Sequence, residues 1–275
     1  MASSSAVETV DKQNIAFWNE LCGTGLAKTL GITDNSAESL KKFDDWYFDF
    51  YPYLYDHIHF DRAGGKKVLE IGLGYGTVAQ KLMESGANYH GLDIANGPVE
   101  MAQHRARLLG READVHQGSA LAIPYPDETF DYVVTIGCLH HTGDLARAMI
   151  EVARVLKKGG EAMIMVYSAV SYRHWKAAPG DTLQRRLRPQ FEWTNADVKL
   201  RKNYDMNQEG SAAPETTFIS PGEARQFLGR HFRTVRVTPR NIGGDFAPAR
   251  FMSREKLNAV FERWVGLDLY IECVK

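Results

Sequence analysis

The 275-residue sequence contains little cysteine and no long apolar run. Its three cysteines, Cys22, Cys138 and Cys273, are an odd number without metal-type spacing, which argues against a disulfide framework or a cysteine-based zinc site. No apolar stretch approaches the roughly 20 residues that span a bilayer, and the first residues lack the basic and apolar regions of a signal peptide. The sequence therefore predicts free thiols, a cytoplasmic location and no membrane partner.

An excess of charge of one sign is also absent. Lysine and arginine number 33 against 34 aspartates and glutamates, giving a formal net charge of −1. Nucleic-acid-binding proteins usually present a strongly basic face, so we expect no nucleic-acid partner. Repeats and low-complexity tracts are missing, while hydrophobic residues make up 44% of the chain. This composition is sufficient for a full globular core.

What the sequence does have is a glycine turn within residues 68–82, VLEIGLGYGTVAQKL. The letters VLEI predict a buried parallel strand, and a helix is expected to resume at about Val78. Gly72, Gly74 and Gly76 lie between them, where the backbone must turn sharply against a ligand without a Cβ in the way. A turn that opens into a helix amino terminus is typical of a nucleotide-type site.

The spacing argues against a dinucleotide. The dinucleotide pattern G-x-G-x-x-G, started at Gly72, requires glycine where the chain has Thr77. Glu70, on the strand, would repel a pyrophosphate and suits a cationic ligand better. The next predicted strand ends in Asp93, 21 residues after Gly72, where an acidic residue accepts hydrogen bonds from ribose hydroxyls. The alternative for Asp93 is a cap of the following helix.

Four motifs in order carry a resemblance to a known family. They are VLEIGLGYG, GLDIA, GSALAIPYPDETFDYVVTIGCLHHTGD and EVARVLKKGGEAMIMVYS. Together they resemble class I S-adenosylmethionine-dependent methyltransferases, most closely the branch that acts on quinones and other small molecules. The likeness is strong over roughly residues 66–168 and weak in the flanks.

The resemblance and the alternation of strands and helices imply a doubly wound α/β fold. We expect a seven-stranded, mostly parallel sheet of the Rossmann-like methyltransferase type. An N-terminal helical cap is predicted at 1–62 and the methyltransferase domain at 63–275. Within that domain a lid or insertion without clear periodicity is expected at about 171–217, after the fifth strand. In the family the last two strands, here 232–238 and 267–274, form an antiparallel hairpin at the sheet edge.

The implied cofactor is S-adenosyl-L-methionine, with S-adenosyl-L-homocysteine as its product. In the family the turn at Ser119 and Ala120 lies beside the adenine ring. The full set of predicted cofactor-binding residues is Glu70, Gly72, Gly74, Gly76, Thr77, Asp93, Ile94, Ser119, Ala120, Gly137 and Tyr51.

One histidine pair is placed to act on an acceptor. Methyl transfer is an in-line displacement, and a base is needed only when the nucleophile arrives protonated. His140 and His141 follow the fourth strand, at the edge where the methyl group should point, and histidine can take a proton at neutral pH. His141 is the preferred base; the alternative is a positioning or structural role. Magnesium-dependent relatives carry aspartates here, whereas this chain has GCLHH, so we expect no metal.

A dense run of aromatic residues, WYFDFYPYLY, occupies 46–55. Tyr47, Tyr51 and Tyr55 would share one helix face if the helix continued through Pro52. Their rings could then cover the sulfonium of the donor as an N-terminal lid. The alternative is a helix packed on the core.

The acceptor side is predicted less specifically. Residues 171–202 carry eight basic and three acidic side chains, which indicates either a solvated surface or an anionic acceptor. Tyr167, Arg173 and Trp175 are the further candidates for acceptor contact. The predicted function is methyl transfer to a small-molecule acceptor, on oxygen rather than carbon, with a homodimer left open.

Three other functions are weighed against this one. The first is a non-catalytic regulatory module that binds S-adenosylmethionine, and the second is a C-methyltransferase with an aromatic-lined pocket. The third is protein or tRNA methylation, which is disfavoured because the N/D-P-P-Y tetrapeptide of amino-group methylases is missing after the fourth strand.

Overall fold

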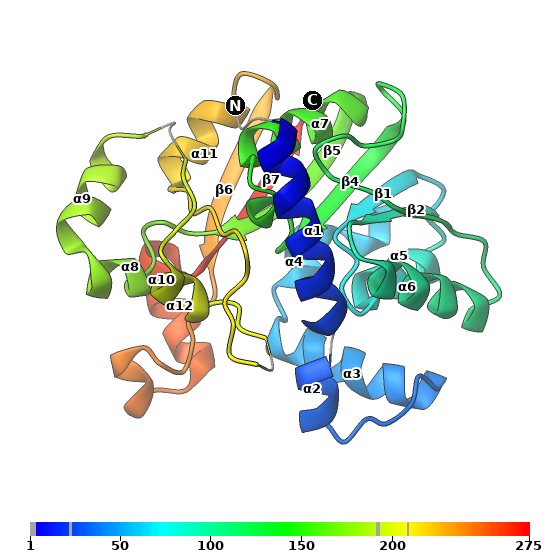
Figure 1. The fold of residues 1–275 in the computed structure, drawn as a ribbon, viewed down its shortest axis with the longest axis horizontal. Coiled ribbons are helices and arrows are strands. Elements are labelled where there is room, and N and C mark those ends of the chain that lie inside the picture. The colour runs from blue at the N-terminus through cyan, green and yellow to red at the C-terminus, as the bar shows by residue number, and fades with distance from the viewer. Residues whose placement is uncertain (1–3, 22–23, 191–192, 208) are drawn as a thin grey trace.

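A single twisted sheet organises the molecule (Figure 1). The computed structural model describes residues 4–21, 24–190, 193–207 and 209–275, so Cys22 lies outside the described residues. In this part of the chain the sheet has seven strands in the order β3-β2-β1-β4-β5-β7-β6. The strands are β1 (Lys67–Ile71), β2 (Asn88–Asp93), β3 (Asp114–Gln117), β4 (Phe130–Ile136), β5 (Leu156–Tyr167), β6 (Thr234–Arg240) and β7 (Asp268–Val274).

The strand directions confirm the predicted doubly wound, mostly parallel sheet. Strands β1 to β5 pair in parallel, and β7 is inserted antiparallel between β5 and β6. In the β5–β7 ladder Glu161 pairs with Val274 and Tyr167 with Asp268. The last two strands therefore form the expected antiparallel hairpin at the sheet edge, separated by a helix of their own.

Twelve α-helices surround this sheet in the described residues. They are α1 (Ser4–Leu21), α2 (Thr24–Thr29), α3 (Ala37–Phe50), α4 (Leu54–Ile58), α5 (Thr77–Glu84), α6 (Asn96–Leu108), α7 (Leu145–Val155), α8 (Tyr172–Ala177), α9 (Pro179–Leu187), α10 (Val198–Lys202), α11 (Pro221–Leu228) and α12 (Arg254–Val265). Helix α11 begins with the capping box formed by Ser220 and Glu223.

The predicted insertion, residues 171–217, is more regular than its sequence suggests. It contains the short helices α8, α9 and α10. Pro179 stands at the first turn of α9, where its missing N–H costs nothing.

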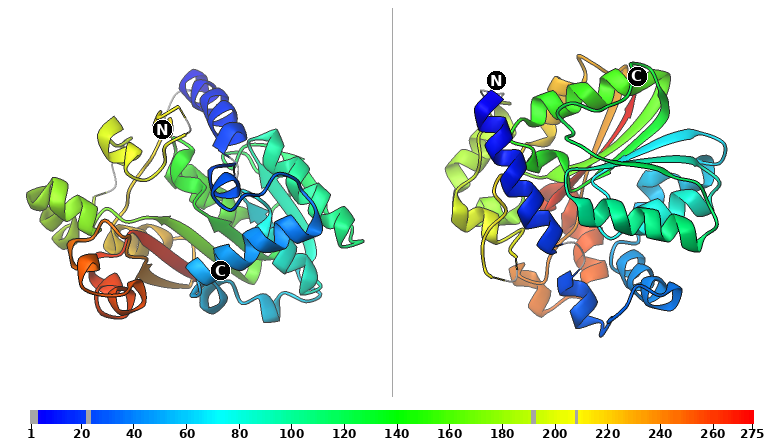
Figure 2. Two further views of the ribbon diagram at one scale, coloured as in Figure 1. Left: turned by 90° about the horizontal axis from the view of Figure 1, so that it is seen from below. Right: turned by 45° about the vertical axis from the view of Figure 1, so that its right-hand side comes forward.

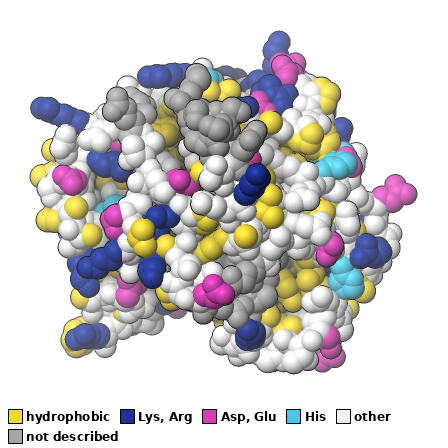
Figure 3. All heavy atoms as spheres, viewed as in Figure 1, with side chains coloured by type: hydrophobic (Ala, Val, Ile, Leu, Met, Phe, Trp, Pro, Cys, Tyr) yellow, Lys and Arg dark blue, Asp and Glu magenta, His cyan; other side chains and the backbone are white. Residues whose placement is uncertain are grey.

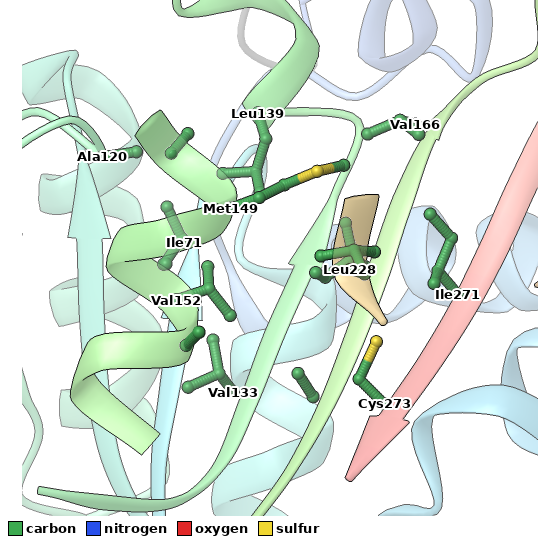
Figure 4. Packing of buried hydrophobic residues seen from close by; sticks show 14 of the residues in the cluster. Ile71, Ala120, Val133, Leu139, Met149, Val152, Val166, Leu228, Ile271 and Cys273 are labelled. Carbon is green, nitrogen blue, oxygen red and sulfur yellow. The ribbon is translucent and has the colours of Figure 1, made fainter. Parts of the chain in front are cut away.

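Apolar side chains cover both faces of the sheet. On one face, residues of α7 and α11 pack against β1, β4 and β5, as Figure 4 shows for Met149, Val152 and Leu228. On the other face, α4, α5 and α6 bury a second cluster that includes Leu54, Leu82 and Ala102. Because the central strands are covered twice, their sequences are nearly continuous apolar runs.

The parallel strands point their carboxyl ends to the same edge of the sheet. The loops that follow β1, β2, β3 and β4 therefore meet there, and α1 passes in front of them (Figures 1 and 2). This edge is where ligands bind in open α/β sheets.

One ion pair ties the N-terminal helices to the turn after β1. The guanidinium of Arg105, on α6, is fully buried and lies 2.7 Å from Asp44 of α3. Its Nε donates to the Tyr75 carbonyl at 2.7 Å, and Asp44 also accepts a hydrogen bond from the Thr77 hydroxyl at 2.6 Å. A buried charge without its partner is strongly destabilising, so the fold depends on Asp44.

We predict that Asp44→Ala lowers the free energy of unfolding by about 3–5 kcal/mol, because it leaves the buried Arg105 uncompensated. Asp45→Ala is the matched control: Asp45 is exposed and pairs only with exposed Lys41, so its loss should cost less than about 1 kcal/mol. Urea unfolding of both variants measures the difference. Equal effects would contradict this account of Arg105.

Candidate active site

A cavity of about 830 Å³ opens at the carboxyl edge of the sheet. Each of the first four parallel strands contributes a residue at or just after its end: Gly72, Asp93, Gly118 and Gly137. The predicted residues Gly74, Ile94, Ser119, Ala120 and His141 also line it, together with the unpredicted Asp11, Asn14 and Trp18. The structure thus brings most of the predicted cofactor-binding residues together around one space.

The glycines of the turn serve different purposes. Gly72 has a φ of +81°, and a Cβ there would lie 2.4 Å from the Cβ of Cys138, in the loop after β4. Gly72 is therefore required for close approach of the two loops. Gly76 does not line the cavity, contrary to prediction: a Cβ there would lie 2.7 Å from Cδ of Arg105. Its small size makes room for that buried side chain.

Asp93 is held by the backbone at the floor of the cavity. Its two carboxylate oxygens accept hydrogen bonds from the backbone N–H groups of Leu73, at 2.7 Å, and Ala95, at 2.9 Å. Burial raises its pKa to about 6, and the backbone hydrogen bonds oppose this. The backbone N–H groups of Gly74 and Ile94 bear on the same carboxylate, so Asp93 braces the turn and the start of α6 while it faces the cavity.

Glu70 borders a second hollow, of about 470 Å³, on the other side of Gly72 and Gly74. Tyr47 and Thr77 line the same hollow. The Tyr89 hydroxyl donates a hydrogen bond to Glu70 at 2.6 Å, but burial dominates and raises the Glu70 pKa to about 8. A cation bound in this hollow would lower the pKa of Glu70 and so favour its carboxylate form.

The two histidines differ in their surroundings. His141 lines the cavity, and its Nδ1 lies 2.6 Å from the carbonyl oxygen of Glu215. A carbonyl only accepts, so Nδ1 carries the proton and Nε2 is left with a lone pair. His140 does not line the cavity; its ring packs 4.1 Å from that of Tyr167, and neither of its nitrogens has a hydrogen-bond partner. Burial lowers the pKa of both rings.

Asp205, on the insertion, faces His141 and was not predicted. Its Oδ2 lies 3.5 Å from Nε2 of His141, and both atoms are buried without a hydrogen-bond partner. Its Oδ1 accepts a hydrogen bond from the Tyr167 hydroxyl at 3.2 Å. Burial raises the pKa of Asp205 and lowers that of His141, and the attraction between the two charged forms opposes both shifts. No sequence motif indicates this residue, because it lies in a stretch without periodicity.

Helix α1 supplies a further wall that sequence reasoning missed. Asp11, Asn14 and Trp18 recur at helical spacing and face the cavity. Asn14 donates a hydrogen bond to the backbone carbonyl of His141 at 2.7 Å, and the Trp18 ring lies 4.8 Å from the His141 ring. Helix α1 thus covers this side of the cavity, and from the aromatic run Tyr47 lines the neighbouring hollow beside Glu70.

The aromatic run itself is divided. Helix α3 ends at Phe50 and α4 begins at Leu54, so the helix does not continue through Pro52. Tyr51 packs against Tyr47 with ring centroids 5.1 Å apart, whereas Tyr55 is 46% exposed and packs against Phe48 and Phe60. Tyr55 lines neither hollow beside the glycine turn, so its ligand contact stays a prediction, and Tyr51 packs against Tyr47 instead of lining the cavity wall.

Arg173 and Trp175 also lie away from the cavity. The Arg173 guanidinium binds both carboxylate oxygens of Asp245 at 2.9 Å, and it stacks 4.8 Å from the Tyr204 ring centre. Its charge is therefore already neutralised within the protein, and its contact with an anionic acceptor stays a prediction. Trp175 does not line the cavity.

The basic excess of the insertion lies largely on its surface. Figure 3 shows Lys and Arg side chains spread among hydrophobic ones over the left-hand part of the molecule, where α9, α10 and α12 lie. Arg185 is an exception, since it pairs with the buried Glu223 at 2.8 Å. The solvated-surface alternative fits these placements better than an anion site.

Metal and membrane features can be stated for the described ranges only. Between residues 4 and 275, leaving out the gaps named above, no group of three or more His, Cys, Asp or Glu side chains is arranged to hold a metal ion. In the same ranges no helix combines the length and apolarity needed to cross a bilayer.

Comparisons with known proteins identify the domain. Residues 69–164 match the family model of a methyltransferase domain. The chain thus contains a methyltransferase domain, and its fold is that of S-adenosylmethionine-dependent class I methyltransferases. Two solved structures of S-adenosylmethionine-dependent methyltransferases share the fold of the domain. One, from Thermotoga maritima, described as a possible histamine N-methyltransferase, has a TM-score of 0.52 at 19% identity over 86% of this chain and 95% of that one. The other, from Methanosarcina mazei, has a TM-score of 0.53 at 18% identity over 82% and 97%.

Curated methyltransferases resemble the domain in sequence. A phthiotriol/phenolphthiotriol dimycocerosates methyltransferase of Mycobacterium tuberculosis is 37% identical over 99 residues, 35% of this chain and 36% of that protein. A fatty-acid O-methyltransferase of Mycolicibacterium smegmatis is 37% identical over 98 residues, 35% of each. Methyltransferase GfsG of Streptomyces halstedii is 35% identical over 114 residues, 40% of each. The match thus spans only about 35–40% of the length of these relatives.

Proposed function

We propose that the protein transfers a methyl group from S-adenosyl-L-methionine to a hydroxyl oxygen of a small molecule. The observation that carries the proposal is the single cavity in which Asp93, the Gly72–Gly74 turn and the His141 ring meet. The relatives named above include a fatty-acid O-methyltransferase, which supports an oxygen acceptor.

The donor would span the two hollows beside the glycine turn. Its ribose hydroxyls would bond Asp93, and its adenine would lie toward Gly118, Ser119 and Ala120. Its amino-acid end would enter the hollow beside Glu70, where the carboxylate compensates the ammonium. The methyl group would then point toward the loop after β4, which carries His141.

His141 is suited to act as the general base. Its Nδ1–H is fixed on the Glu215 carbonyl, so the free lone pair is on Nε2. A hydroxyl acceptor could give its proton to this nitrogen as its oxygen attacks the methyl carbon. Cys138 lines the same cavity, but burial raises the pKa of its thiol, so it stays protonated and is no nucleophile.

Donor binding gives the first prediction. Purified protein should bind S-adenosyl-L-homocysteine with micromolar affinity or better in isothermal titration calorimetry. Asp93→Ala should abolish binding, because it removes the ribose acceptor and the brace of the turn. Asp114→Ala is the control, since Asp114 lies on β3 outside the cavity. Absence of binding by the folded wild-type protein would overturn the proposed function.

The pH dependence of binding gives a second prediction. With a pKa of about 8, Glu70 is mostly protonated at pH 7 in the free protein. A cationic group beside it favours the carboxylate, so binding should release close to one proton at pH 7, and affinity should rise up to about pH 8. Asp93, with its pKa of about 6, has already ionised over this range.

Calorimetry in buffers of different ionisation enthalpy counts the released protons. In Glu70→Gln the release at pH 7 should vanish and the affinity should no longer depend on pH between about 6.5 and 8.5. Proton release unchanged in this variant would assign it to another group.

Turnover gives the third prediction, read by transfer of tritiated methyl groups to a panel of phenols, hydroxylated acyl chains and fatty acids. His141→Gln should lower methylation of a hydroxyl acceptor by about 100-fold or more at neutral pH. A carboxylate arrives ionised and needs no base, so methylation of a fatty acid should be nearly unaffected.

Asp205→Asn should instead move the acidic limb of the pH profile to lower pH, because the charge of Asp205 raises the His141 pKa. Unchanged hydroxyl methylation in His141→Gln across pH 6 to 9 would exclude His141 as the base.

A further inference from the structure

Helix α1 brings a carboxylate to the far end of the donor cavity. Asp11 lines the cavity, and its carboxylate is hydrogen-bonded by the side chain of Ser119, in the turn after β3. It is partly buried, which raises its pKa, while the Ser119 hydrogen bond and the charge of Arg147 on α7 oppose this. An ionised carboxylate that faces a cavity accepts hydrogen bonds and cannot donate them, so it favours a ligand with a donor at that point.

The position of Asp11 is fixed by contacts on both sides of the cavity. Asn14 bonds the His141 carbonyl on one rim, at 2.7 Å. On the other rim, Asn19 accepts a hydrogen bond from the backbone N–H of Gly97, at the start of α6, at 2.8 Å. Val10 packs against Gly143, where an added Cβ would lie 3.3 Å from its side chain. These contacts hold α1 across the cavity from the loop after β4 to α6.

The direction of the donor across the sheet decides what Asp11 meets. Asp93, at the end of β2, marks the ribose, and the cavity continues from it past Ile94 and Pro98 to the turn after β3. Gly118 in that turn has no room for a side chain, since a Cβ would lie 2.9 Å from Leu92. A flat base against this turn would have its edge toward Ser119 and Asp11, which line the same cavity.

We propose that Asp11, together with Ser119, recognises the 6-amino group of the donor's adenine, so that α1 sets the base specificity of the site. The amine is a hydrogen-bond donor, and the carboxylate offers the acceptor that it needs. This inference rests on the proposed function, because it requires S-adenosylmethionine as the ligand. Helix α1 would thus recognise the adenine base, which the glycine turn and Asp93 do not contact.

A double-mutant cycle between protein and ligand tests the proposal. The two ligands are S-adenosyl-L-homocysteine and its purine analogue, in which hydrogen replaces the 6-amino group. By calorimetry the wild-type protein should bind the analogue at least about tenfold more weakly, because Asp11 then loses its partner. In Asp11→Ala the two affinities should lie within about threefold of each other. Alanine is the best helix former, so α1 keeps its conformation in this variant.

Two further variants separate recognition from general effects. Asp45→Ala removes the same charge from the exposed surface of α3 and should keep the wild-type ratio. Asn14→Ala removes the hydrogen bond that ties α1 to the loop after β4, and it should weaken the binding of both ligands by the same factor. Loss of S-adenosyl-L-homocysteine binding in the wild type would overturn the proposed function itself. Tight binding with no preference for the amine, or a wild-type preference kept in Asp11→Ala, would overturn only the role of Asp11.

Discussion

The buried guanidinium of Arg105 is the interaction on which the site depends. It reaches from α6 under the turn after β1, bonds the Tyr75 carbonyl, and occupies the space that a side chain at position 76 would need. Asp44 neutralises it and at the same time accepts the Thr77 hydroxyl at the start of α5. The shape of the turn is thus set by a charge pair behind it, and the N-terminal helices belong to the same structural unit as the sheet.

The central part of the fold could be read from the sequence. Strand β4 ends at Ile136, just before the GCLHH segment that was expected to follow the fourth strand, and the ends of β1 and β2 place Gly72 and Asp93 at the cavity. These elements are predictable because local pattern and tertiary burial agree: a strand covered on both faces must be apolar, and a tight turn must carry glycine.

The flanking segments could not be read in the same way. Asp11, Asn14 and Asp205 reach the cavity from α1 and from the insertion, and their placement depends on long-range docking that leaves no periodic signal. Arg173 and Tyr55 illustrate the converse. Their residue types suited a ligand, but Arg173 binds Asp245, and Tyr55, after the break between α3 and α4, packs against Phe48 and Phe60. Residue type alone does not determine which partner a side chain contacts in the folded protein.

The close packing of Gly72 on Cys138 couples the glycine turn to the loop that carries His141. The turn that holds the donor and the loop that carries His141 touch backbone to side chain, with no space for a methyl group between them. They therefore move as one body, and the distance from donor to base is fixed by the sheet. The insertion meets this body at His141, through Asp205, Glu215 and Thr216. Because Asp205 bears on the pKa of His141 and the Glu215 carbonyl holds its tautomer, the insertion also tunes the base, so replacing it would alter the chemistry as well as the acceptor.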